Sequence, residues 1–351
     1  MSVKRSLFLS PACLVFWAIV LSFQIVNGAE PNFKILDGKQ VAVNGKVFKS
    51  TKEYFLSNYF KKTGRRCGTK NYTFSGPGDR TILREAADCT TGVTVIQAEY
   101  WLELSRTIPV VVHIIHKADG TGNLDDARIA RQIEVLNEDF GAPVGILGRK
   151  SAGSGIQFEL AGITRTANDN WFSDYDENGY KSALGWDPAH YCNIYVNTAG
   201  GFLGYAYFPQ ENSGVLDGLV INFTAFGGRN EGIAPYDQGR TVVHEMGHYL
   251  GLYHTFDGYS ACSNTYTTGD RIVDTPAESE EHYSCTETYS CDTADPIHNY
   301  MNYTPDICMN LFTAEQANRM VCSLLNYRSE LSFVQLETPN LAPIYNLLLQ
   351  E

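Results

Sequence analysis

HEMGHYLGLYH, residues 244–254, is the stretch that decides the fold. In an α-helix, His244 and His248 are four residues apart and therefore lie on the same face. Two neutral imidazoles that close together can bind one divalent metal ion, and they suit zinc. Glu245 lies beside that face, where it can take a proton from a metal-bound water. The stretch therefore predicts a helix that carries a metal site.

The spacing continues into a third ligand. Gly251 allows the chain to turn sharply, so that His254 returns with another ring nitrogen, and the whole stretch fits H-E-x-x-H-x-x-G-x-x-H. The alternative is an amphipathic helix that happens to carry three histidines, but five fixed positions in eleven residues argue against it. Downstream, Met301 in HNYMNY (residues 298–303) stands where a methionine turn would lie beneath the metal.

Length and composition describe an ordinary globular protein. The 351 residues allow one large domain or two smaller ones, and 44% are hydrophobic and 19% charged. The net charge of -12 argues against a nucleic-acid partner, because nucleic acid needs basic patches. Residues 30–70 carry ten Lys or Arg and three Asp or Glu, whereas residues 71–351 carry fifteen and thirty-six. A basic leading segment and an acidic remainder are expected to attract each other.

The first 28 residues are typical of a signal peptide. Lys4 and Arg5 precede an apolar run over residues 7–26, and small residues before Ala29 offer a cleavage site. The run is nearly long enough to span a bilayer, so an uncleaved anchor is the alternative. No other stretch could cross a membrane, and we expect no stable membrane partner.

Export is also favoured by eight cysteines beyond this run and by Asn-X-Thr sequons at Asn71 and Asn222. A third sequon, at Asn302, falls inside the expected methionine turn and is expected to be too buried for use. We therefore expect a secreted, extracellular glycoprotein.

Hydrophobic periodicity predicts most of the regular structure. Strands are expected at residues 107–116, 156–160, 192–196 and 219–223. Helices are expected at residues 51–61, 125–140, 238–251 and 313–325, the last with Thr313 and Glu315–Gln316 as candidate capping groups near its start. Residues 252–306 show little periodicity, so this segment needs disulfides or ions to hold it.

Beyond these patterns, the chain resembles a secreted metzincin of the pappalysin family, of the compact, ulilysin-like type. The resemblance covers residues 107 to about 325 through IPVVVHII, WDPAHYCNIYV, LGYAYFP, DGLVIN, GRTVVHEMGHYLGLYHTF, DTPAE, DPIHNYMNY and CMNLFT, in family order. It implies an α+β metzincin fold, with a twisted mixed sheet and an active-site helix above an irregular, disulfide-bonded lower subdomain closed by a C-terminal helix. The implied organisation is a signal peptide (1–28), a pro-segment (29–84, with a boundary as late as about 100), a catalytic domain (85–335) and a tail (336–351).

The resemblance also implies an activity. It implies a zinc endopeptidase that acts on proteins or peptides, with zinc held by the three histidines and Glu245 as general base and then proton donor. Tyr303 resembles the family tyrosine that supports the oxyanion, the alternative being a packed aromatic. Met301 is expected to form a hydrophobic floor rather than to bind the metal.

Cys67, in RRCGT (residues 65–69), resembles the family's cysteine switch, in which a pro-segment thiolate binds the zinc of the zymogen. A thiolate is a good zinc ligand, and Arg65 and Arg66 are expected to favour the charged form. The alternative is half of an ordinary disulfide. The chain's own pro-segment is thus an expected partner.

Three further assignments concern the expected lower subdomain. The resemblance implies disulfides Cys262–Cys291 and Cys285–Cys308; among the remaining Cys89, Cys192 and Cys322, we guess Cys192–Cys322, although sequence cannot fix connectivity. Asp306 matches an acidic residue that pairs with Arg or Lys after the scissile bond, the alternative being a solvated loop aspartate. The loop with Asp270, Asp274 and Thr275 is of the kind that binds structural calcium.

Five other histidines have no metal-ligand spacing and are expected to be structural: His113, His116, His190, His282 and His298. Among them, His298 is the candidate for a contact behind the zinc ligands. Two further hypotheses compete with the enzyme reading. A catalytically inactive metzincin fold used for binding or adhesion would usually have lost a ligand or the glutamate, and here every position is intact. Another metzincin group would have a different specificity, but LGYAYFP and DPIHNYMNY favour the pappalysins.

Overall fold

The computed structural model describes residues 33–36, 39–63, 65–70, 89, 100, 102, 104–141, 153–211, 213–228, 230–258, 262–265 and 268–334. These residues all belong to one structural unit. The expected signal peptide, the sequon at Asn71 and the expected C-terminal tail lie outside the described residues. Within the described part of the chain, no helix is long and apolar enough to span a membrane.

The strands are β1 (Phe33–Ile35), β2 (Val41–Val43), β3 (Lys46–Phe48), β4 (Arg106–His116), β5 (Ile156–Ala167), β6 (Cys192–Asn197), β7 (Gly204–Ala206), β8 (Leu219–Asn222) and β9 (Phe333–Val334). The α-helices are α1 (Thr51–Leu56), α2 (Asn58–Lys62), α3 (Asp126–Phe140), α4 (Asp169–Phe172), α5 (Glu177–Leu184), α6 (Arg240–Tyr249) and α7 (Ala314–Tyr327).

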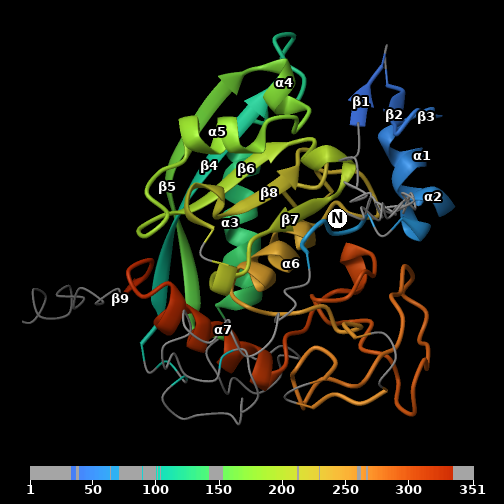
Figure 1. The fold of residues 1–351 in the computed structure, drawn as a ribbon, viewed down its shortest axis with the longest axis vertical. Coiled ribbons are helices and arrows are strands. Elements are labelled where there is room, and N and C mark those ends of the chain that lie inside the picture. Colours follow the sequence, from blue (N-terminus) through green and yellow to red (C-terminus); the bar gives the residue numbers. More distant parts are fainter. Residues whose placement is uncertain are drawn as a thin grey trace, which may run out of the picture. The chain divides into compact units, whose positions relative to one another are not determined.

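The larger sheet is mixed and runs in the order β5-β4-β6-β8-β7 (Figure 1). β4 pairs in parallel with β5 and β6, and β6 pairs in parallel with β8. β7 is antiparallel to β8 and forms an edge of the sheet, while β9 pairs with the start of β4. The expected strands are therefore present, and β5 continues seven residues beyond the predicted end at residue 160.

Both faces of this sheet are covered, which explains why its central strands are rich in β-branched residues. Successive side chains of a strand point to opposite faces. Val112 and Ile114 of β4 belong to the core shared with α3 and α6. Ile115 instead packs in a second cluster with Phe172 and Tyr180 from α4 and α5. The sheet thus gives α6 a rigid base.

Helix α7 closes the fold beside an irregular segment, as predicted. Thr313 and Gln316 form a reciprocal capping box at its start. The disulfides Cys262–Cys291 and Cys285–Cys308 are both present and hold the irregular segment.

The guess of a Cys192–Cys322 disulfide is wrong. Cys322 of α7 is bonded to Cys89 instead, and Cys192 is a free, buried residue at the start of β6. In the core, Cys192 lies beside Tyr249 and Arg328, and burial raises the pKa of its thiol to about 12. Cys192 therefore behaves as a small hydrophobic side chain.

The Asn-X-Thr sequon at Asn222 begins at a buried residue. Asn222 is fully buried at the end of β8, and its side-chain amide donates hydrogen bonds to the carbonyls of Thr198 and Phe202. A glycan cannot be attached to this nitrogen in the folded chain. Asn302 is fully buried, as expected.

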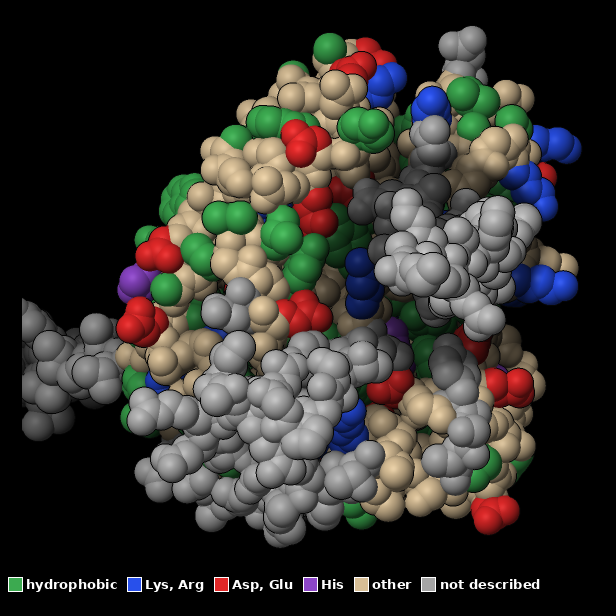
Figure 2. Space-filling model, in the orientation of Figure 1, with side chains coloured by type: hydrophobic (Ala, Val, Ile, Leu, Met, Phe, Trp, Pro, Cys, Tyr) green, Lys and Arg blue, Asp and Glu red, His purple; other side chains and the backbone are tan. Residues whose placement is uncertain are grey.

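The described N-terminal segment, residues 33–70, has a small core of its own. Strands β1, β2 and β3 form an antiparallel sheet. The helix predicted over residues 51–61 is divided at Ser57, whose hydroxyl caps α2. Aromatic residues of the segment pack against the rest of the chain: Phe33, Tyr54, Phe55 and Phe60 with Leu203 and Tyr236. Figure 2 shows Lys and Arg side chains gathered over this segment.

Candidate active site

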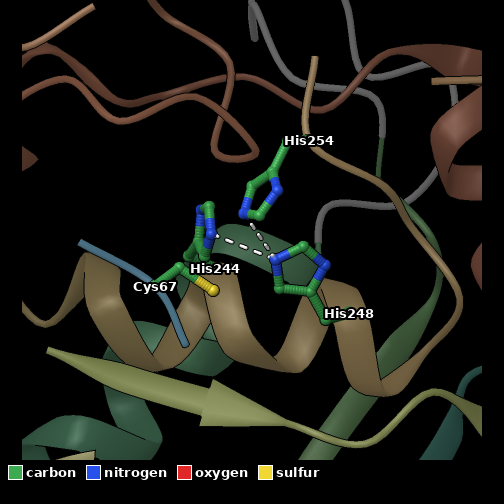
Figure 3. Close-up of side chains that lie close together, drawn as sticks. All are labelled: Cys67, His244, His248 and His254. Carbon is green, nitrogen blue, oxygen red and sulfur yellow. Dashed lines mark hydrogen bonds between the residues drawn. The ribbon is translucent and has the colours of Figure 1, made fainter. Parts of the chain in front are cut away.

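Three histidines converge above helix α6 (Figure 3). His244 and His248 lie one turn apart, with their Nε2 atoms 3.2 Å from each other. Gly251 follows the helix with φ +93°, and a Cβ there would lie 2.5 Å from Ser323 Oγ, so the turn requires glycine. After the turn, His254 Nε2 lies 3.0 Å from His248 Nε2.

Two backbone carbonyls set the tautomers of the helical histidines. His244 Nδ1 lies 2.7 Å from the Tyr300 carbonyl, and His248 Nδ1 lies 2.7 Å from the Leu252 carbonyl. Because a carbonyl can only accept, each Nδ1 carries the hydrogen and each Nε2 lone pair points into the cluster. Burial lowers the pKa of all three imidazoles, that of His248 to about 3. Neutral, convergent imidazole nitrogens fit a divalent metal ion.

Met301 lies beneath this cluster. The side chain is fully buried, and a Cβ on Gly247 of α6 would lie 2.4 Å from its sulfur. Asn299 Oδ1 accepts a hydrogen bond from the Met301 N–H and so fixes the turn. Met301 therefore packs against the helix that carries the histidines, while the preceding Tyr300 carbonyl orients His244.

Glu245 is buried beside the histidines. Its Oε2 accepts a hydrogen bond of 2.9 Å from the Thr69 hydroxyl. Burial raises the pKa of Glu245 to about 7, although Arg66 and Thr69 act in the opposite direction. A Cβ on Gly204 of β7 would lie 2.8 Å from Glu245 Cγ, so β7 approaches this side chain closely only because glycine stands there.

Cys67 lies in the same cluster. Its Sγ and one ring nitrogen of each of the three histidines lie within 4.8 Å of one another, and all four residues are buried (Figure 3). The thiol donates to Glu245 Oε2 at 3.3 Å, and Cys67 forms no disulfide, which excludes that alternative. Its segment runs along edge strand β7, with the Gly68 N–H donating to the Gly204 carbonyl at 2.8 Å.

The neighbouring arginines do not act on this thiol as expected. Arg65 lies over the ring of Phe202, and Arg66 lies over the ring of Tyr236. Burial and the Glu245 carboxylate raise the pKa of Cys67 well above its usual value. The expectation that Arg65 and Arg66 favour the thiolate is therefore wrong, and a bound cation is the group that could stabilise that form here.

Asp306 begins a 3-10 turn (Asp306–Cys308). Its side chain lies against the N-terminal end of α6. Its Oδ2 accepts hydrogen bonds from the N–H groups of Gln238 (3.0 Å) and Arg240 (3.1 Å), where anions are favoured. Its Oδ1 lies 3.8 Å from Arg66 Nη2, and both side chains are fully buried. Asp306 is therefore not a solvated loop residue.

Comparisons with known proteins place this site in a family. The family model described as pregnancy-associated plasma protein-A matches residues 176–325. An extracellular metalloprotease of Arthroderma benhamiae is 35% identical over 260 residues, which cover 71% of this chain and 89% of that protein. One of Pyricularia oryzae is 38% identical over 235 residues, covering 64% and 76%.

The chain belongs to the pappalysin family of metalloproteases.

Solved pappalysin structures agree with the fold. Mature mirolysin of Tannerella forsythia, in complex with a cleaved peptide, is similar with a TM-score of 0.54 and 34% identity, covering 66% of this chain and 96% of mirolysin. A promirolysin mutant is similar with a TM-score of 0.60 and 32% identity, covering 76% and 97%. The predicted α+β metzincin fold is thus confirmed, and this pappalysin is a metalloendopeptidase.

Other predicted residues of the pappalysin lie around the centre or away from it. Tyr303 is buried against the rings of His254 and Phe256, with centroids 4.9 and 4.7 Å away. Asp270 is buried, whereas Asp274 Oδ2 accepts a hydrogen bond from the Glu315 N–H of α7. His298 Nδ1 lies 2.7 Å from the Cys308 carbonyl, so it supports the chain next to Asp306 rather than a zinc ligand.

Two contacts of the pappalysin site carry no motif in the sequence. Thr69 bonds to Glu245 and also accepts a hydrogen bond from the Ala206 N–H, so it ties the N-terminal segment to β7. Tyr236, under the Arg66 guanidinium, belongs to a loop with no motif. Only the proximity of Thr69 to Cys67 in sequence could have pointed to the first contact.

Proposed function

We propose that this pappalysin is a secreted zinc endopeptidase made as a latent precursor. The observation that carries the proposal is the convergence of three histidine nitrogens and the Cys67 sulfur, with the Glu245 carboxylate beside them. Three neutral imidazoles leave a fourth position for water or an inhibitory thiolate. The extracellular relatives support secretion with residues 1–28 as signal peptide.

Zinc held by His244, His248 and His254 would act as a Lewis acid toward water and the scissile carbonyl. Glu245 takes the proton of the attacking water and passes it to the leaving amine. Its pKa near 7 suits a group that must both accept and donate a proton. Tyr303, whose ring packs against His254, would support the oxyanion with its hydroxyl.

Latency follows from the N-terminal segment, which we assign as a pro-segment over residues 29–84, with a boundary as late as about 100. Cys67 fills the fourth position, and its neighbours bond to edge strand β7, where an extended substrate would add as a further strand. The greater share of this chain covered by promirolysin than by mature mirolysin supports the assignment.

Specificity follows from Asp306. In the precursor, the guanidinium of Arg66 lies beside the Asp306 carboxylate and over the ring of Tyr236. After the pro-segment leaves, a substrate Arg or Lys following the scissile bond would take the same place. Arg is favoured because its planar guanidinium presents several donors to a carboxylate.

A structural calcium ion is also proposed in the loop that contains Asp270, Asp274 and Thr275. Asp270 Oδ1 accepts a hydrogen bond from the Ile272 N–H. Asp270 Oδ2 and Thr275 Oγ1 are buried, and within the described residues neither forms a hydrogen bond of normal geometry. Such oxygen atoms suit calcium. Asp274, bonded to α7, is the weakest member of the set.

A peptide-library assay tests the function. The precursor is processed by limited proteolysis, saturated with zinc and incubated with the library, with and without a zinc chelator. We expect cleavage before Arg and Lys, loss of cleavage with the chelator, and recovery when zinc is restored. A processed, zinc-saturated protein that cuts no peptide would instead support the inactive binding or adhesion protein.

A further inference from the structure

A second group of metal-ligating side chains lies in the irregular segment after the active-site helix. Glu278, His282 and Asp295 each offer one donor atom, and these atoms lie within 4.8 Å of one another. His282 Nε2 is 2.9 Å from Asp295 Oδ2 and 3.3 Å from Glu278 Oε1. Side chains of Glu278 and Asp295 are withdrawn from solvent, and His282 is 9% exposed.

The geometry differs from that of a hydrogen-bonded ion pair. His282 Nε2 is buried and has no hydrogen-bond partner among the described residues, because neither nearby carboxylate oxygen has the required alignment with the ring nitrogen. This nitrogen thus lies close to both carboxylates without a hydrogen bond to either. Donors that surround a common point at these distances match a tetrahedral ion, whose ligand atoms are about 3.4 Å apart for bonds of about 2.1 Å.

The distances between the donor atoms can be compared with those in the histidine cluster of the active site. Its ring nitrogens converge to 3.0 and 3.2 Å, which is the same range as the two contacts of His282. In each group, two donors have outer hydrogen bonds that fix their orientation, as metal ligands usually do: His244 and His248 in the first, Glu278 and Asp295 in the second. Glu278 accepts from Thr255 Oγ1 and Asn302 Nδ2, and Asp295 accepts from Ser290 Oγ.

We infer that Glu278, His282 and Asp295 bind a second divalent transition-metal ion of the zinc class. Two carboxylates and a neutral imidazole carry a charge of -2, which a divalent ion neutralises in this buried position. One nitrogen and two oxygen donors suit zinc, whereas calcium prefers six to eight oxygen ligands.

The second ion would be structural. Glu278 bonds to Thr255, which follows His254, and to Asn302, which follows Met301. Asp295 bonds through Ser290, next to the disulfide residue Cys291. A metal ion here would therefore hold the irregular segment against two other parts of the chain. One is the stretch that follows His254, and the other is the stretch that follows Met301.

Metal analysis of the full precursor tests the inference. The metal-free chain is titrated with zinc, dialysed and analysed for bound metal, alongside His282→Asn, His248→Ala and the double variant. We expect two zinc ions per chain for wild type, one for each single variant and none for the double variant. His190→Asn is the matched control, since exposed His190 also lies beside carboxylates, Asp187 and Glu330, and should retain two.

Wild type alone keeps the inference falsifiable if His282→Asn does not fold. One zinc per wild-type chain would overturn it. Millimolar calcium that displaces the second zinc would also overturn the assignment. Loss of zinc in His282→Asn but not in His248→Ala would overturn the catalytic site of the proposed function and leave the second site standing.

Discussion

Arg66 of the N-terminal segment lies within 3.8 Å of Asp306 at the start of the active-site helix, and neither side chain is exposed. The same segment carries Cys67 to the three histidines. One short stretch therefore occupies both the metal centre and the pocket that we assign to a basic substrate residue. Its sequence places a basic side chain where a substrate would place one.

Replacing Arg66 with Ala should weaken the hold of the pro-segment. The Asp306 charge would then be buried without its cation, and loss of a charged contact typically costs about 1.5–3 kcal/mol. We expect the precursor to convert roughly tenfold faster or more, followed by gel electrophoresis over time. Arg65→Ala is the matched control because Arg65 contacts Phe202 instead. Equal acceleration in both variants would show that charge alone matters.

Replacing Cys67 with Ala should give a precursor that becomes active earlier than wild type. The variant removes the sulfur donor while leaving Arg66 in its pocket. Cys192→Ala is the control, since Cys192 is also free and buried but lies in the sheet. Activity on a short peptide is measured over the same time course for the variant and the wild-type precursor. A Cys67 variant as latent as wild type would rule out the thiol as the inhibitory group.

Replacing Asp306 with Asn should flatten the preference for basic residues. Asn keeps an oxygen that can accept from the Gln238 or Arg240 N–H, so the start of α6 is preserved. Selectivity, measured as the ratio of kcat/KM for peptides with Arg or Ala after the cut, should fall roughly tenfold to a hundredfold. Asp237→Asn serves as the control. An unchanged ratio would remove Asp306 from the pocket.

Replacing Asp174 with Asn should change how stability depends on pH. Burial raises the pKa of Asp174 to about 7, whereas the unfolded value is near 3.8. Between these values the native state holds a proton that the unfolded chain releases, so this contribution to stability falls as pH rises. Asn lacks that titration and tolerates the φ of +61° at this position.

Urea unfolding at pH 5 and pH 8 measures the effect. The loss of stability between the two pH values should be smaller for Asp174→Asn than for wild type. The exposed Asp292→Asn variant is the control and should keep the wild-type difference. The same difference in Asp174→Asn would mean that Asp174 is already ionised at pH 5.

Residue spacing and hydrophobic patterns predicted the helices and strands that their own residues specify. The spacing of the histidines and the glycine in HEMGHYLGLYH predicted α6 and the turn after it. The β-branched run predicted β4. Each of these elements is specified by its own residues. The helix over residues 51–61 failed in detail because Ser57 competes as a cap. The sequon at Asn222 does not reveal that its amide lies at the end of a buried strand.

Contacts between distant segments could not be predicted in this way. Cys89 and Cys322 are 233 residues apart, so nothing local distinguished this pair from Cys192–Cys322. Arg66 was expected to act on the adjacent thiol, but the fold directs it to Asp306. His282 shows no metal spacing because its partners lie 4 and 13 residues away in an irregular segment.

The most direct test of the central claim is the Glu245→Gln variant of the processed enzyme. Gln has nearly the same shape and can still accept a hydrogen bond from a hydroxyl, but it cannot accept the proton of the attacking water. Zinc content and kcat on one peptide are measured together for the variant and wild type. We predict unchanged zinc content and a fall in kcat of about 10²–10⁴-fold. A variant that keeps both its zinc and its wild-type kcat would contradict the assignment of Glu245 as general base and, with it, the proposed mechanism.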